Sequence, residues 1–100
     1  MDDPTDLQGQ EQQADEKSRK AQLDRRQQVD DLKWLMAHPQ GRRIVTRIFE
    51  RTGIRRTPFH TNGSTMAFNA GAQNVGLWLE AEVLEAAFDA YMKLLKEFQA

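Results

Sequence analysis

The sequence contains no cysteine, so the chain can form neither a disulfide framework nor a thiolate metal site. Its two histidines, His38 and His60, have no second ligand at metal-binding spacing, and we therefore expect no metal or other cofactor. There is no run of about 18 apolar residues, and the first residues are acidic, where an export signal would be basic and then apolar. These absences predict a soluble protein without a recognisable export signal.

Hydrophobic residues make up 39% of the 100 residues, and they are scarce before Val29 and dense after Phe68. A chain of this length forms at most one domain, and it buries only about two-thirds of its unfolded surface. We expect an acidic, flexible arm over residues 1–14, which has too little apolar surface to fold alone. A single helical domain over residues 15–100 follows it, with a thin core.

Apolar residues recur every three or four positions through most of that domain, which predicts an all-α fold. The expected elements are helices over 15–37, 40–52 (rich in arginine) and 64–98 and a loop over 53–63. The last pattern fits one long helix or two helices that divide near 87–89, where Asp89 could cap the second. The predicted architecture is a small bundle of three to four helices, with a polar N-terminal arm and a long C-terminal seam or helical hairpin.

The apolar stripe of each predicted helix identifies its share of the core. The expected core residues are Trp34, Leu35, Ile48, Phe49, Leu79 and Val83. Gly71 and Gly76 each reduce the stability of the C-terminal helix by up to about 1 kcal/mol relative to alanine. We expect that they occur there because another helix packs close to them. His38 and Pro39 are expected to end one helix and begin the next.

No combination of residues predicts catalysis. Glu80, Glu82 and Glu85 are of the type used in acid-base chemistry, but they lie on the polar side of an amphipathic pattern, where solvated carboxylates are expected. His60 stands near Ser64 only within a loop, and a nucleophilic site needs a scaffold that aligns its members. We therefore expect a protein that is not an enzyme.

Charge divides the chain into three zones. Residues 1–41 hold 6 basic and 9 acidic residues (net −3), residues 42–56 hold 6 and 1 (net +5), and residues 57–100 hold 2 and 5 (net −3). The basic residues of the middle zone are Arg42, Arg43, Arg47, Arg51, Arg55 and Arg56. Because guanidinium groups bind carboxylates and phosphates bidentately, both an acidic protein surface and DNA are candidate partners.

An isoelectric point near 6.1 and the lack of aromatic residues interleaved with these arginines favour the protein surface. Trp78 lies between Leu77 and Leu79, so one of the three must leave the apolar seam. We expect Trp78 to bind a partner as well, so that the arginine helix and the aromatic seam form two contact surfaces.

Two stretches of the sequence, DLKWLMAHPQGRRIVTRIFERTGI and FNAGAQNVGLWLEAEVLEA, resemble a family of small proteins encoded in the head gene clusters of short-tailed bacteriophages. The resemblance covers about residues 31–96. Its marks are Trp34 with Leu35, His38 with Pro39, Gly41 with Arg42 and Arg43, Phe68 with Asn69 and Gly71, and Asn74 with Val75 and Gly76. It implies a non-enzymatic virion or assembly protein near the portal, the head-to-tail connector or the internal proteins ejected with the genome.

The residues and the resemblance together predict a multi-copy structural protein of the virion, assembled in the cytoplasm of the bacterial host. Its expected partners are the phage portal or neighbouring virion proteins and further copies of itself in a homo-oligomeric ring, with no membrane in the mature particle. The alternative is a small phage nucleic-acid-binding protein in which the basic stretch from Arg42 to Arg56 contacts DNA.

Overall fold

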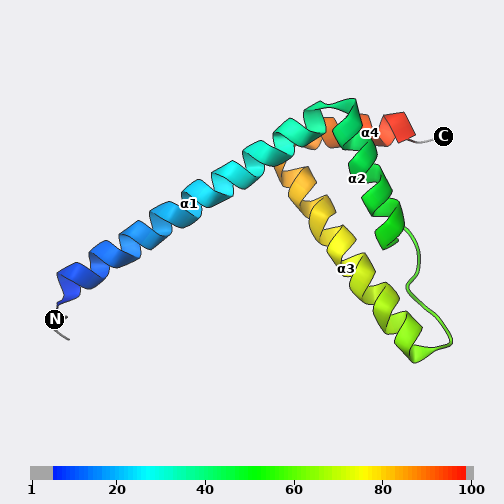
Figure 1. Ribbon diagram of the computed structural model, residues 1–100, viewed down its shortest axis with the longest axis horizontal. Coiled ribbons are helices and arrows are strands. Elements are labelled where there is room, and N and C mark those ends of the chain that lie inside the picture. The colour runs from blue at the N-terminus through cyan, green and yellow to red at the C-terminus, as the bar shows by residue number, and fades with distance from the viewer. Residues whose placement is uncertain (1–5, 99–100) are drawn as a thin grey trace.

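The computed structural model describes residues 6–98 of the chain (Figure 1). Its elements are the helices α1 (Leu7–Ala37), α2 (Pro39–Thr52), α3 (Gly63–Ala86) and α4 (Phe88–Phe98). Residues 6–98 include no strand, and the predicted all-α fold is confirmed. The C-terminal seam forms two helices, because the backbone leaves the helical conformation at Ala87.

Helix α1 begins at Leu7, although the sequence predicts a flexible arm up to residue 14. The Asp6 carboxylate accepts a hydrogen bond from Gly9 N at 2.9 Å and so caps the first turn. The residues that follow, mostly glutamine, glutamate and alanine, are good helix formers, and they extend a helix whose far end is packed in the body. The prediction of an unstructured arm is therefore wrong for residues 7–14, and residues 1–5 lie outside the described part of the chain.

A sharp corner joins α1 to α2 at His38, which has an extended backbone and precedes Pro39 in the first position of α2, as predicted. A Cβ atom added to Gly41 would collide with Leu35 O, so the two helices approach closely at this corner. At its other end α2 stops at Gly53, which has a left-handed backbone with φ of 69° and donates its N–H to Phe49 O.

The core is small and is shared by all four helices and the turn after α2. Its buried members are Met36, Val45, Phe49, Ile54, Val83, Tyr91 and Leu94. Helix α2 lies beside α3, and α4 lies across their ends next to the last turns of α1 (Figure 1). A Cβ atom at Gly76 would collide with Thr52 and Ile54, which confirms the predicted close approach at Gly76, whereas Gly71 has no such neighbour among the described residues.

The predicted core is correct in part. Phe49 and Val83 are buried, and Leu35 and Leu79 are half-buried against the core. The predictions for Trp34, which is 67% exposed, and for Ile48, which is also exposed, are wrong.

The register of each helix explains the two errors. Helix α1 buries Met36, and a residue two positions away lies about 200° around the helix, so Trp34 points outward. Helix α2 buries the row that contains Val45 and Phe49, and this row turns Ile48 toward the surface.

The molecule is long and thin, measuring 62 × 38 × 15 Å. Its radius of gyration is 19.9 Å, whereas a compact chain of 100 residues has a radius of about 13 Å. Residues 7–24 of α1 account for the difference, because they run away from the other helices (Figure 1) and are exposed throughout apart from Gly9. The molecule therefore consists of a compact body and a projecting helix, each with its own exposed surface.

Candidate partner-binding surfaces

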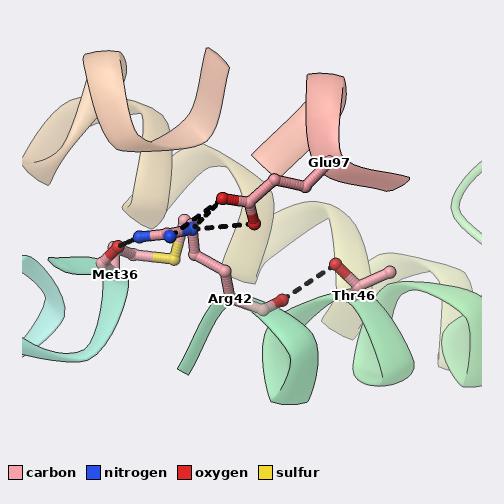
Figure 2. Close-up of polar contacts among 4 residues, drawn as sticks. All are labelled: Met36, Arg42, Thr46 and Glu97. Carbon is pink, nitrogen blue, oxygen red and sulfur yellow. Dashed lines mark hydrogen bonds and ion pairs between the residues drawn. The ribbon is translucent and has the colours of Figure 1, made fainter. Parts of the chain in front are cut away.

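Arg42 was expected to bind a partner, but it is only 3% exposed and is bound inside the chain. Its Nε and Nη2 atoms donate hydrogen bonds of 2.9 to 3.1 Å to the Glu97 carboxylate, and its Nη1 atom donates to Met36 O at 2.8 Å (Figure 2). The hydrogen bonds from Arg42 lower the pKa of Glu97 and outweigh its desolvation, which acts in the opposite direction. The prediction for Arg42 is therefore wrong, since this side chain fastens the end of α4 to the corner between α1 and α2.

Arg55 also bonds within the chain. Its Nη2 atom donates to Glu80 Oε2 at 2.6 Å and to the Tyr91 hydroxyl at 2.9 Å, and the same hydroxyl donates to Glu80 Oε2 at 2.6 Å. Burial alone would raise the pKa of Glu80, but the hydrogen bonds from Arg55 and Tyr91 outweigh it and lower that pKa. Burial and the adjacent carboxylate raise the pKa of Tyr91. This triad joins the turn after α2 to α3 and α4.

The remaining contacts of α3 carboxylates involve Arg25 of α1, which the sequence did not single out. Arg25 Nη2 donates a hydrogen bond to Glu85 Oε2 at 2.8 Å. Arg25 Nη1 lies 2.6 Å from Glu82 Oε2, which is buried. This second contact is an ion pair but does not have hydrogen-bond geometry. The close contact with the Glu82 carboxylate is the main cause that raises the pKa of Arg25. The predicted solvated face is thus wrong for Glu80 and Glu82, and Glu85 alone of the three is mostly exposed.

Arg43, Arg47 and Arg51 form a row along the exposed side of α2, one turn apart. Successive members are about 6 Å apart along the helix axis. None of the three forms an ion pair with any residue in the range 6–98. Arg47 and Arg51 also line a shallow hollow with the exposed residues Ile44 and Ile48. This arginine row is the part of the predicted basic surface that is open to a partner.

Arg56 and Trp78 complete the predicted set. Arg56 is exposed and donates from Nη2 to Glu50 O at 2.7 Å, so its guanidinium is partly used in closing the end of α2. Trp78 is 61% exposed on α3. It lies about 200° around α3 from Gly76, which packs against Thr52 of α2, so the indole points away from α2. The exposed arginine row thus lies on α2 and the exposed indole on α3, on two different faces of the body.

Two negative observations apply to the described range 6–98. It has no group of three or more histidine, aspartate or glutamate side chains placed to hold a metal ion. Within the same range, no helix has the length and apolar composition needed to cross a membrane.

These features define a small helical protein whose distinctive chemistry lies on exposed faces of its helices. The family model for Bbp19-like phage proteins matches residues 32–95, which is more than half of the chain. The chain belongs to this family and is a phage protein. Comparison with curated proteins and comparison with solved structures each gave no match. The predicted resemblance covers residues 31–96, and the family match begins one residue later and ends one residue earlier. All of the projecting part of α1, residues 7–24, lies outside the family region.

Proposed function

We propose that the protein is a non-enzymatic structural or assembly subunit of the phage particle. It is present there in several copies, next to the portal, the head-to-tail connector or the internal ejected proteins. The observation that carries this proposal is the amount of large apolar surface left exposed by so small a core. The aromatic residues more than half exposed are Trp34, Phe59, Phe68, Trp78 and Phe88. Exposed apolar surface of this extent marks interaction sites in soluble proteins, and a phage particle supplies protein surfaces to cover it.

The arginine row gives the proposed subunit a second contact. Arg43, Arg47 and Arg51 repel one another unless an anionic surface receives them, and carboxylates bind guanidinium groups in a bidentate fashion. An acidic surface of the portal or of a neighbouring virion protein meets this requirement. Most soluble oligomers have closed symmetry, and we propose that copies of this subunit form a closed ring. Assembly of the particle in the host cytoplasm would give each copy its partners.

Substitution of the arginine row tests the proposal in the phage itself. The variant Arg43→Ala with Arg47→Ala removes two exposed charges that have no ion-pair partner within residues 6–98, so the protein folds. We expect this variant to be missing from purified particles. The matched control, Arg26→Ala with Lys33→Ala, removes the same charge from exposed positions of α1, and we expect normal incorporation. Equal incorporation of both variants would contradict a role for the arginine row in assembly.

A nucleic-acid-binding role is the second candidate function, because the same arginine row could contact successive phosphates. Retention of the protein on duplex DNA, measured across a salt series, separates the two roles. DNA binding would weaken steeply with salt as counterions return to the phosphates. If the double arginine variant lost DNA retention but entered particles normally, the nucleic-acid role would replace the structural one.

A further inference from the structure

One face of α3 carries two rows of residues with seven-residue spacing. Phe68, Val75 and Glu82 form the first row, and Gly71, Trp78 and Glu85 form the second. Residues seven apart lie almost above one another on a helix, so both rows belong to a single face. This α3 face is covered by α1 only at its C-terminal end, where Arg25 contacts Glu82 and Glu85.

The N-terminal end of the α3 face is open. Phe68 is 76% exposed, Val75 is 56% exposed and Trp78 is 61% exposed. Figure 1 shows why, because α1 and α3 diverge from the point where they meet, and their N-terminal halves run in different directions. Among residues 6–98, the apolar part of this face therefore has no cover.

Helix α1 carries a matching row that is also uncovered. Its members before Arg25 are Leu7, Glu11, Ala14, Ser18 and Ala21, spaced alternately by four and three residues. Beyond Arg25 the row continues into the core through Leu32 and Met36. Within the described part of the chain, no ion pair and no side-chain hydrogen bond joins residues 7–24 to α2, α3 or α4. Its small side chains at 14, 18 and 21 leave room for large side chains of the kind that α3 exposes.

We propose that two copies of this chain associate by each laying residues 7–24 of its α1 on the open α3 face of the other. The contact continues between copies the α1-on-α3 packing that Arg25, Glu82 and Glu85 begin within one copy. It rests on the proposed multi-copy role and identifies a surface through which the copies meet.

The stability of the projecting helix supports residues 7–24 of a second copy, rather than a second α3 face, as the segment that covers the α3 face. A helix in a protein is stabilised mainly by packing of one face, and residues 7–24 have no such packing against the rest of the described range 6–98. Two α3 faces packed against each other would cover Phe68 and Trp78 but leave both α1 rows bare. The α1-on-α3 contact covers both kinds of surface at once.

The surface area is also sufficient. A buried aromatic side chain contributes about 150 to 250 Å², so the exposed parts of Phe68, Val75 and Trp78 give each copy roughly 300 to 400 Å² on α3 alone. The facing α1 row loses a similar area, and two-fold symmetry makes the contact twice. The total is on the order of 1,200 Å², which is the lower end of the range for specific protein interfaces.

Sedimentation of the full-length protein gives the first test. We expect the wild-type chain to form a dimer whose fraction rises with concentration. Val75→Asp on α3 and Ala14→Lys on α1 change exposed residues of the two proposed surfaces, so both variants remain helical and sediment as monomers. The matched controls Leu77→Asp and Gln12→Lys place the same charges at exposed positions off these surfaces and stay dimeric. A monomeric wild-type chain, or a dimer unaffected by both Val75→Asp and Ala14→Lys, would overturn the proposal.

Cross-linking identifies which segment of the second copy covers the α3 face. Because the sequence has no cysteine, each introduced cysteine is the sole thiol of its chain. Chains with Ser18→Cys and chains with Val75→Cys, distinguished by a size tag, are mixed and treated with a flexible bis-maleimide. We expect cross-links between the two kinds of chain, and none when Glu16→Cys, on the opposite side of α1, replaces Ser18→Cys. Cross-links of Val75→Cys chains only to each other would overturn the α1 occupant. These results are independent of the proposed function, which instead fails if the wild-type protein is missing from particles.

Discussion

Arg42 and Glu97 lie 55 positions apart in the chain and form a bidentate ion pair, with three nitrogen-to-oxygen distances between 2.9 and 3.1 Å. The guanidinium is almost completely buried, and its third nitrogen is bonded to Met36 O. One side chain thus joins the end of α1, the start of α2 and the last turn of α4 (Figure 2).

We predict that Arg42→Ala lowers the midpoint of thermal unfolding much more than Arg43→Ala does. The first change removes the donor to both Glu97 and Met36 O and leaves a space at the corner, whereas Arg43 is exposed. Circular dichroism of the two variants gives the comparison. Equal midpoints would show that the internal contact contributes nothing to stability.

The same contact predicts a dependence of stability on pH. Hydrogen bonds from Arg42 lower the pKa of Glu97 below its ordinary value of 4.5, so the folded chain binds this proton more weakly than the unfolded chain. The stabilisation is complete above the ordinary value and is lost as the pH falls through the lower, folded value. The difference in unfolding free energy between wild type and Glu97→Gln should therefore be constant near neutral pH and shrink in acid. Urea titrations over a pH series measure it, and a difference that grows in acid would contradict the sign of the shift.

Truncation of core residues should separate Met36 from Trp34, although they are neighbours on α1. Met36 is fully buried, so Met36→Ala should reduce the unfolding free energy by about 2 to 5 kcal/mol. Trp34 is mostly exposed, so Trp34→Ala should change it by about 0.5 kcal/mol. Chemical denaturation provides both values. A larger loss for Trp34→Ala than for Met36→Ala would reverse the orientation of α1 described above.

The corner between α1 and α2 depends on the absence of a side chain at Gly41. Because a Cβ atom there would collide with Leu35 O, Gly41→Ala should destabilise the protein by about 1 to 3 kcal/mol through forced movement of the backbone. Gly63→Ala is the matched control, since a Cβ atom at Gly63 meets nothing within 4 Å. If denaturation midpoints of the two variants were the same, the two helices could not approach as closely as they do here.

Local sequence signals predict the helices well. The period of apolar residues identifies all of the helical regions, and the backbone requirements of Pro39 and Gly53 place the two ends of α2. The start of α1 is missed, because low apolar content is a poor guide to a helix that is anchored only at its far end. Asp6 followed by strong helix formers was the available signal for that start.

The candidate site is harder to predict, because burial of a charged side chain depends on distant residues. Arg42 lies three positions before Val45 and seven before Phe49, on the buried row of α2, and this register could have separated it from Arg43. Its partner Glu97 has no local relation to it. The contact of Arg25 with Glu82 likewise joins two helices that only the folded chain brings together.

The central claim is that this phage protein is a structural subunit of the particle. A quantitative mass-spectrometric inventory of purified phage particles tests it most directly, with the portal subunit as the internal standard for copy number. The account predicts peptides of this chain in the particles, at several copies per portal ring. Abundant protein in the infected-cell lysate, with none retained in purified particles, would contradict it.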